Sequence, residues 1–283
     1  MQAFVITAYK DKKQLLRLLD KVSHIGKVYI HIDKKSNELE PEEIKKYIPP
    51  NVTVVRKYKI YWGAYNHIQA ILDLVKMAVS DEDIHYVHII SGQDYPVKSK
   101  EEFERKFDIN YKLIHMSCSD KSIYDSGVVE RYGYWYPVTN YDPNALITRL
   151  INRLAVSCQK IINIKRTGIG DFSEIYKGMI YTSAPKEAFK YALDYIENYP
   201  KLLRDIKHTR IAEEFLFQTI FMNSKYKENV NSNGLRYNDW KNGDGKSPAY
   251  LTVNNYEDIK NGEYFFARKF ASGISDELLE KLI

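Results

Sequence analysis

The sequence predicts an α/β fold, in which a mostly parallel central sheet is flanked by helices. Two observations support this prediction. Short apolar runs alternate with amphipathic, helix-like segments over residues 3–90, and such alternation is typical of a parallel, doubly wound sheet. No Gly/Ser-rich or Pro-rich linker divides the 283 residues, so we expect a single domain over residues 1–283.

The first three elements are predicted to be a strand, a helix and a strand. Residues 3–8, Ala-Phe-Val-Ile-Thr-Ala, form an apolar run of the length of a buried strand. Residues 11–23 place their leucines and Val22 at helical spacing, which predicts a helix with one buried face. Residues 28–33, Val-Tyr-Ile-His-Ile-Asp, predict the second strand.

The alternation continues with a strand at 52–56, a helix at 65–79 and a strand at 85–90. The apolar residues of this helix gather on one face, as in a helix that covers a sheet. Parallel α/β sheets bind their ligands at the carboxyl ends of the strands. Candidate binding residues therefore follow these strands directly, and they are Tyr9, Lys10, Asp33, Lys34, Lys35, Ser91, Gly92, Gln93 and Asp94.

The rest of the chain is less periodic. The stretch 112–177 combines clustered tyrosines with charged residues and predicts an irregular region. Helices are expected over 183–199 and 208–223, and the polar, Gly- and Asn-rich stretch 237–245 predicts a loop. A short helix is expected from Asp276 onward.

Composition and charge disfavour several classes of protein. The net charge is +5, with 42 basic against 37 acidic residues, which suits an anionic small ligand or an acidic membrane surface better than nucleic acid. The two cysteines, Cys118 and Cys158, cannot build a disulfide framework and favour a reducing compartment. No apolar run approaches the roughly 20 residues of a membrane span, and no signal peptide precedes the first strand. We expect a cytoplasmic protein, with peripheral attachment to the inner face of a membrane left open.

Five sequence blocks follow one another along most of the chain. They are His-Ile-Asp-Lys-Lys-Ser at 31–36, Tyr-Trp-Gly-Ala-Tyr-Asn at 61–66, Ser-Gly-Gln-Asp-Tyr-Pro at 91–96, Glu-Glu-Phe-Leu-Phe-Gln-Thr at 213–219 and Phe-Phe-Ala-Arg-Lys-Phe at 265–270. Together they resemble the core-2/I-branching β-1,6-N-acetylglucosaminyltransferase family, which also contains the peptide O-xylosyltransferases. The resemblance implies a GT-A-like fold, inverting transfer from a nucleotide sugar and no divalent metal. Basic side chains near the C-terminus would neutralise the diphosphate instead.

The pair Glu213-Glu214 supplies the candidate catalytic base. Neighbouring residues of a helix point about 100° apart, so one cleft should face only one of the two. The catalytic carboxylate of the family matches Glu214, which would take the proton of the acceptor hydroxyl, and Glu213 would support it. A solvated acidic face is the alternative interpretation of such a pair.

The donor site is predicted from the resemblance and from the apolar surroundings of two cations. Arg268 and Lys269 lie within an apolar run, and the phosphate-contacting lysine of the family matches Lys269. A second basic residue of the family, found further upstream, falls on Lys246, for which a solvated loop lysine is the alternative. Asp33 matches a residue near the uridine. Asp94 is a candidate donor contact, or else a structural cap of its turn.

No metal ion and no other cofactor are expected. The string Asp81-Glu82-Asp83 precedes a predicted strand, whereas ligand sites follow strands. After the fourth strand, the run 91–94 offers one carboxylate, which is thin ligation for Mg²⁺ or Mn²⁺.

The acceptor is expected to be a saccharide, such as a lipid-linked precursor of a surface polysaccharide. The resemblance implies acceptor contacts at Glu130, Arg131 and Trp240, and tryptophan rings stack well on sugars. A loop anchor is the alternative role of Trp240. The stretch 177–182 departs from the family pattern beside the transfer site, which leaves the sugar preferences open.

The leading hypothesis is an inverting transferase that uses UDP-N-acetylglucosamine. Residues 1–110 would form its nucleotide-binding half, and residues 111–283 its acceptor and catalytic half. UDP-xylose and UDP-galactose are alternative donors. A glycosidase with Glu214 and Asp94 as paired carboxylates is a further alternative, and so is a non-catalytic protein that binds a nucleotide sugar or glycan. The cysteines and membrane anchor of the secretory members are not found, which fits a bacterial cytoplasmic relative.

Overall fold

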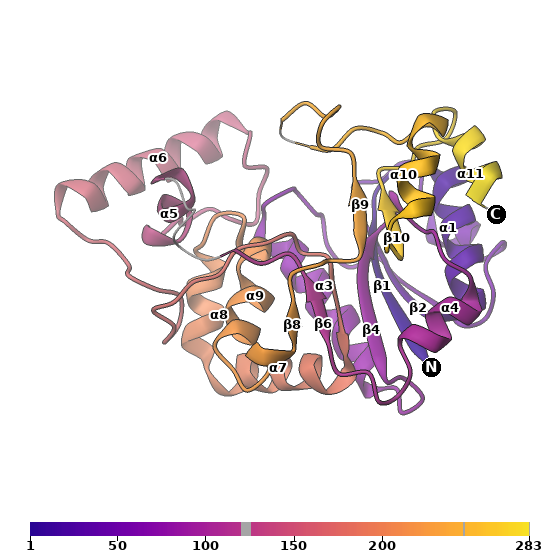
Figure 1. Ribbon diagram of the computed structural model, residues 1–283. Coiled ribbons are helices and arrows are strands. Elements are labelled where there is room, and N and C mark those ends of the chain that lie inside the picture. The colour runs from indigo at the N-terminus through magenta and orange to yellow at the C-terminus, as the bar shows by residue number, and fades with distance from the viewer. Residues whose placement is uncertain (120–125, 246, 283) are drawn as a thin grey trace.

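A seven-stranded sheet forms the centre of the molecule (Figure 1). The structure is a computed structural model that describes residues 1–119, 126–245 and 247–282. The strand order is β3-β2-β1-β4-β7-β6-β8. The strands are β1 (Gln2–Ala8), β2 (Gly26–Ile32), β3 (Val52–Val55), β4 (Tyr86–Ser91), β6 (Ile114–Met116), β7 (Thr182–Pro185) and β8 (Val230–Asn231).

The sheet is mostly parallel, as predicted. Strands β3, β2, β1 and β4 run parallel to one another, while β7 is antiparallel to both β4 and β6, and β6 and β8 are parallel. The central strand β1 is buried along almost its whole length, which explains its continuous apolar run. The predicted α/β class with a flanked central sheet is therefore confirmed.

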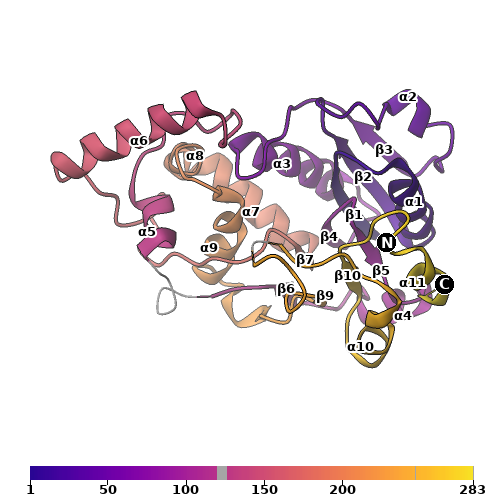
Figure 2. The same cartoon turned by 90° about the horizontal axis from the view of Figure 1, so that it is seen from above.

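Helices cover both faces of the sheet. On β1, Ala3 and Val5 belong to one hydrophobic core, with side chains of α3, α7 and α9, while Phe4 and Ile6 belong to a second core with α1, α4 and α11. Figure 2 shows α11 beside α1, where Asp276 pairs with Lys13 at 3.2 Å. The α-helices are α1 (Lys12–Ile25), α2 (Pro41–Ile44), α3 (Tyr65–Ser80), α4 (Lys100–Lys106), α5 (Ser126–Gly133), α6 (Leu146–Ile161), α7 (Lys186–Asn198), α8 (Pro200–Lys207), α9 (Leu216–Met222), α10 (Tyr256–Asn261) and α11 (Asp276–Leu282), and the 3₁₀ turns are η2 (Ala212–Glu214), η3 (Lys227–Asn229) and η4 (Val253–Asn255).

A second, three-stranded sheet brings the C-terminal part of the chain back to the end of β4. Its order is β5 (Asp94–Pro96), β10 (Phe266–Arg268) and β9 (Arg236–Asn238). Strand β10 is antiparallel to β5, and this register sets Arg268 opposite Asp94. Two candidate donor-site residues that are far apart in sequence thus become direct neighbours.

Three of the predicted elements are wrong in detail. The region 112–177 is not irregular throughout, because 146–161 form the helix α6, whose leucines recur every four residues. The predicted helix 183–199 begins only at Lys186, since the preceding residues pair as β7 with β4 and β6. The predicted helix 208–223 is interrupted, because Ile211 has a left-handed backbone with φ 54°.

The described helices include none that is both long enough and apolar enough to cross a membrane.

Candidate functional site

Residues that follow β1 and β4 meet at the carboxyl edge of the sheet. Lys10 Nζ donates a hydrogen bond of 3.1 Å to the hydroxyl of Tyr250, and Gln93 Nε2 donates one of 3.3 Å to the same oxygen. Two residues that follow predicted strands, Lys10 and Gln93, are thus brought together by Tyr250, and their role in binding stays a prediction. The hydrogen bond from Lys10 lowers the pKa of Tyr250.

Three cations lie in this region, and we call Lys10, Arg268 and Lys269 the basic cluster. Burial, and then the nearby charge of Arg268, lower the pKa of Lys269. Burial alone would lower the pKa of Arg268, but Tyr181 and Asp94 raise this pKa above its ordinary value. Such a cluster, partly removed from water, is suited to binding an anion. Lys246, the second predicted phosphate ligand, lies outside the described residues.

Asp94 is completely buried and holds the turn after β4. Its Oδ2 accepts a hydrogen bond of 2.6 Å from the backbone N–H of Ser91, while its Oδ1 lies 3.6 Å from Nε of Arg268. The carboxylate therefore fixes both the turn and the guanidinium. This geometry fits the predicted structural cap, and a direct contact of Asp94 with the donor stays a prediction.

Asp33 and His31 shape the end of β2. Asp33 is buried, and its Oδ1 accepts hydrogen bonds from the backbone N–H groups of Lys35 (2.8 Å) and Ile60 (3.1 Å). Nε2 of His31 accepts from Lys57 N (3.1 Å) and Tyr58 N (3.0 Å). Burial lowers the pKa of His31 to about 4. Both side chains thus hold the segment 57–60 against the sheet, and the uridine contact of Asp33 stays a prediction.

The candidate base Glu214 ends the turn η2 and is held by two cations. Its Oε2 accepts a hydrogen bond of 2.9 Å from Arg131 on α5 and lies 3.2 Å from Nζ of Lys177. The side chain remains 23% exposed. Within the described part of the chain, Oε1 forms no hydrogen bond. The carboxylate is therefore fixed through Oε2.

Glu213 points into the protein instead. Its side chain is only 5% exposed, and its Oε1 accepts a hydrogen bond of 3.1 Å from the backbone of Gly63 and lies 3.6 Å from Nδ1 of His67. Gly63 has φ 75°, a conformation that suits glycine, and it lies two residues before the start of α3. As expected for adjacent residues, only one carboxylate of the pair faces outward, while Glu213 fixes η2 to the start of α3.

A short segment, residues 177–181, connects the base to the basic cluster. At its start, Lys177 contacts Glu214, and the backbone N–H of Gly178 donates a hydrogen bond of 2.9 Å to the carbonyl of Glu214. At its end, the ring centroid of Tyr181 lies 4.0 Å from the guanidinium carbon of Arg268. Four residues of extended chain span at most about 14 Å. The base and the basic cluster therefore border the same short segment.

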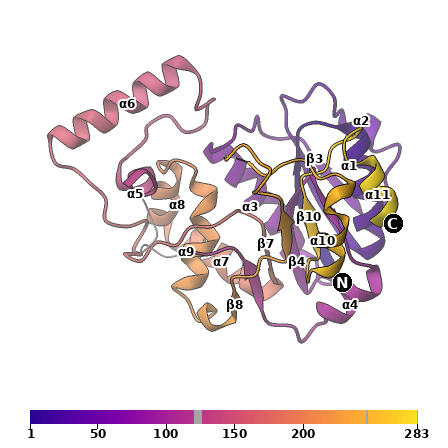
Figure 3. The same cartoon turned by 45° about the horizontal axis from the view of Figure 1, so that its top comes forward.

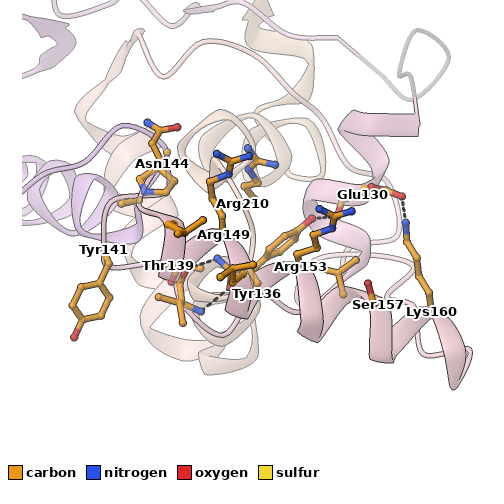
Figure 4. A pocket seen from close by; sticks show the side chains of 18 residues that line it. Glu130, Tyr136, Thr139, Tyr141, Asn144, Arg149, Arg153, Ser157, Lys160 and Arg210 are labelled. Atoms are coloured by element: carbon orange, nitrogen blue, oxygen red, sulfur yellow. Dashed lines mark hydrogen bonds and ion pairs between the residues drawn. The ribbon is translucent and has the colours of Figure 1, made fainter.

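A cavity of about 720 Å³ lies between α6, α5 and the start of α3 (Figure 4). Glu130 lines it, pairs with Lys160 at 2.6 Å and directly precedes Arg131, the partner of Glu214. Arg149, Arg153 and Arg210 also contribute to its wall. The charged residues of the cavity wall are therefore mainly basic, and the cavity lies next to the residue that holds the candidate base.

The predicted acceptor residues do not all lie together. Arg131 contacts Glu214 and Glu130 lines the cavity, whereas Trp240 is half exposed in the loop after β9. This loop is fixed by Asp239, which accepts hydrogen bonds from Asn242 and Asn255. In the described ranges, no hydrogen bond or ring contact joins Trp240 to Glu130 or Arg131. The acceptor roles of all three residues stay predictions.

The Asp-x-Asp string lies at the opposite edge of the sheet from the basic cluster, before β4. Asp81 and Asp83 both accept hydrogen bonds of 2.8 Å from Nζ of Lys27. Both carboxylates are therefore ion-pair partners of this lysine. The described residues contain no group of three or more His, Cys, Asp or Glu side chains placed to hold a metal ion. The metal independence of the reaction stays a prediction.

Sequence reasoning did not assign four residues of this region. Lys10 was recognisable by its place after the first strand, but it carried no specific role. Lys177, Tyr181 and Tyr250 are brought in by tertiary contacts, and no spacing pattern signals them.

The chain is similar to known proteins over most of its length. The family model for the Core-2/I-branching enzyme matches residues 2–263. Xylosyltransferase 2 of Canis lupus familiaris is 25% identical over 300 residues, which cover 95% of this chain and 32% of the relative. Xylosyltransferase sqv-6 of Caenorhabditis briggsae is 19% identical over 240 residues, covering 82% of this chain and 27% of the relative. The chain thus spans about a third of the length of these curated relatives.

Solved structures with partial similarity include S. aureus TarS in complex with UDP-GlcNAc, with a TM-score of 0.31 and 16% identity, covering 41% of this chain and 33% of that one. A second is the 4-diphosphocytidyl-2C-methyl-D-erythritol synthase of Anaerococcus prevotii, with a TM-score of 0.37 and 14% identity, covering 71% and 76%.

Proposed function

We propose that this chain, which belongs to the Core-2/I-branching enzyme family, is a glycosyltransferase that moves a sugar from a UDP-sugar to a hydroxyl of an acceptor saccharide. The reaction inverts the anomeric centre and uses no metal ion. Three tasks have to be performed: deprotonating the acceptor, neutralising the leaving diphosphate, and holding the two substrates in line.

Glu214 is the general base of the proposed reaction. The acceptor hydroxyl gives its proton to Oε1 as its oxygen attacks C1 of the donor sugar, and the bond from C1 to the diphosphate oxygen breaks on the opposite side. Arg131 and Lys177 hold the other carboxylate oxygen, Oε2, and so fix the orientation of the base. Preorganisation of this kind avoids a reorientation cost at the moment of transfer.

The basic cluster takes up the charge of the leaving UDP. Lys269 and Lys10 supply the charge that faces the phosphates, and Arg268 is fixed between Asp94 and the ring of Tyr181. Because these cations are preassembled beside β1 and β10, they supply the neutralisation that a divalent ion provides in other sites. Lys246 is proposed as a further phosphate ligand.

The observation that carries this proposal is the segment 177–181. Its first residue, Lys177, contacts the base, and its last residue, Tyr181, contacts the basic cluster. The Cα atoms of Lys177 and Tyr181 are at most about 14 Å apart. A carboxylate and a cationic cluster at the two ends of so short a segment suit a site that binds an acceptor hydroxyl and a diphosphate together.

The donor is proposed to be UDP-N-acetylglucosamine, in the synthesis of a surface glycan on a lipid-linked saccharide. UDP-xylose is the second candidate, since the curated relatives that cover most of this chain are named xylosyltransferases. UDP-galactose is a third.

The test is isothermal titration of the three UDP-sugars in EDTA against wild type, Lys269→Ala and Lys112→Ala, an exposed lysine outside the site. We expect one UDP-sugar to bind wild type and Lys112→Ala, and binding to Lys269→Ala to be at least about tenfold weaker. Binding that requires added Mn²⁺ or Mg²⁺ would contradict the metal-free site.

Product analysis then distinguishes the reaction classes. A transferase releases UDP quickly only when an acceptor saccharide is present, whereas a glycosidase hydrolyses a glycoside without one. A non-catalytic binding protein forms no product with any acceptor. In that last case, Glu214→Gln would bind the UDP-sugar and behave like wild type in every assay.

A further inference from the structure

Helix α6 is oriented with its polar side toward the protein. Of its 16 residues, Thr148 alone is buried. Asn152 exchanges two hydrogen bonds with the backbone of Val138, at 3.1 and 2.8 Å. Gln159 does the same with the backbone of Trp135, at 2.8 and 2.9 Å. Polar side chains therefore attach this helix to the protein, whereas a surface helix normally packs against the core through apolar side chains.

The apolar side of α6 faces away from the body. We call Ile147, Ile151, Leu154 and Ile161 the outer apolar face, and these side chains are 69%, 41%, 66% and 79% exposed. At about 100° per residue they fall within one narrow arc of the helix. Figures 1 and 3 show α6 at the outer end of the molecule, beyond α5 and α8, in agreement with this exposure. An exposed apolar patch of this kind marks a binding surface.

The charges around this face have one sign. Between Asp142 and Asp171 the chain carries five Lys and Arg residues and no Asp or Glu. Arg149 and Arg153 lie on the flank of the helix that borders the cavity, and neither forms an ion pair within the described part of the chain. Long basic side chains beside an apolar strip place their charges at the level of lipid headgroups.

We propose that α6 binds in the plane of an anionic lipid bilayer, with its outer apolar face among the acyl chains and its cations at the headgroups. The helix is about 24 Å long, shorter than the roughly 30 Å of a hydrocarbon core, so it lies on the membrane and does not cross it. A second copy of this chain is the poorer partner, because it would present an equally basic surface. An anionic bilayer offers both acyl chains for the outer apolar face and negative headgroups for the cations.

Docking through α6 also brings the cavity to the membrane surface. Leu146 and Leu150 belong to the same helix but line the cavity that neighbours Arg131 and Glu214. In Figure 1, α6 and the loop after β9 project to the same upper side of the molecule. A saccharide carried on a lipid would thus reach the cavity from the bilayer. This last step rests on the proposed function, whereas membrane binding itself does not.

The test is flotation of the full chain with vesicles of phosphatidylcholine alone and of an equimolar mixture with phosphatidylglycerol. Wild type is expected to float with the anionic vesicles and to be released by high salt. Ile147→Ser/Ile151→Ser/Leu154→Ser is expected to lower the partition coefficient at least about tenfold. The matched control is Tyr47→Ser/Met77→Ser/Ile109→Ser, which removes three exposed apolar side chains elsewhere and should bind like wild type.

Arg149→Gln/Arg153→Gln tests the charge contribution, and it should weaken binding to anionic vesicles several-fold. Unchanged thermal unfolding of each variant shows that it is folded, as expected for side chains outside the core. Wild type that fails to float with anionic vesicles overturns the proposal. So does a concentration-dependent dimer that the triple α6 variant abolishes while vesicle binding is absent, since a second copy would then occupy this face. Because no sugar transfer is measured, failure here is separate from failure of the proposed function.

Discussion

Arg131 and Glu214 are joined by a hydrogen bond of 2.9 Å, from the guanidinium NH1 to Oε2 of the carboxylate. Lys177 lies 3.2 Å from that same oxygen. Both cations therefore engage the same carboxylate oxygen. In the proposed reaction Oε1 takes the proton of the acceptor hydroxyl, so the base and the residues that orient it can be tested separately.

Removing the base is expected to abolish transfer without affecting the donor. Glu214→Gln keeps the shape of the side chain but cannot take a proton, so kcat should fall about 10²- to 10⁴-fold. Titration calorimetry should find the same UDP-sugar affinity as wild type. Glu228→Gln, an exposed acidic residue away from the site, is the matched control and should keep full activity. Full activity of Glu214→Gln would exclude it as the base.

Arg131 is expected to act as a positioning residue. Arg131→Gln removes the hydrogen bond to Oε2, so kcat should fall about tenfold or more while the KM for the UDP-sugar stays constant. Arg131→Lys keeps the charge and should restore part of the rate, although it lacks the planar fork. Steady-state kinetics of both variants check this. A rise in the acceptor KM with unchanged kcat would instead assign Arg131 to acceptor binding, as the sequence resemblance implied.

The affinity for the donor is expected to fall at alkaline pH. Burial and the charge of Arg268 lower the pKa of Lys269, so this lysine loses its proton at a lower pH than an ordinary lysine. Binding of the diphosphate should therefore weaken as pH rises, before solvent-exposed lysines titrate. Lys269→Arg stays charged and should keep its affinity to higher pH. Calorimetric titrations across an alkaline pH series measure this, and parallel curves for the two proteins would rule it out.

Stability is expected to fall under mildly acidic conditions. Burial lowers the pKa of His31 and of His115 to about 4 each, from the ordinary value of 6.5. Between pH 6.5 and 4 these histidines bind protons in the unfolded chain but not in the folded one. The free energy of unfolding is therefore highest above pH 6.5 and decreases as the pH falls toward 4. Each pKa unit corresponds to about 1.4 kcal/mol, which gives a loss of a few kcal/mol per histidine.

Thermal unfolding between neutral and acidic pH tests this loss. His31→Gln keeps a hydrogen-bond acceptor but cannot be protonated, so its melting temperature should depend less on pH than that of wild type. His24→Gln, which changes an exposed histidine of α1, should follow the wild-type curve. Identical pH dependence of His31→Gln and wild type would exclude His31 as a source of the acid sensitivity.

The first part of the fold could be predicted from sequence because its signals are local. The predicted strands and helices up to β4 differ from their observed bounds by only a few residues, since apolar periodicity and burial agree there, whereas the short helix α2 was not predicted. The helix α6 shows the opposite case. Its apolar residues recur at helical spacing, but only Thr148 is buried. Packing against a core, the usual cause of such spacing, therefore does not explain it. The apolar strip around Leu154 faces outward instead.

The candidate site was predictable only in part. The angle between neighbouring residues predicted that Glu213 and Glu214 would not face the same side, and the resemblance selected Glu214, although the element is a 3₁₀ turn that follows the left-handed Ile211. The partners of Glu214 could not be found, because Arg131 and Lys177 approach it from 83 and 37 positions earlier in the chain. Contacts of this kind are set by the tertiary fold, which no local pattern encodes.

The position of the segment 177–181 between the two sites has a consequence for the affinities of the donor and the acceptor. One end touches the residue that would receive the acceptor, and the other touches the cations that would receive the donor. If UDP binding displaced Tyr181 and the shift extended over four residues to Lys177, the donor and acceptor sites would be coupled. Linkage is reciprocal, so an acceptor that shifts Lys177 changes the affinity for UDP by the same factor. The two substrates would then affect each other's binding through these five residues.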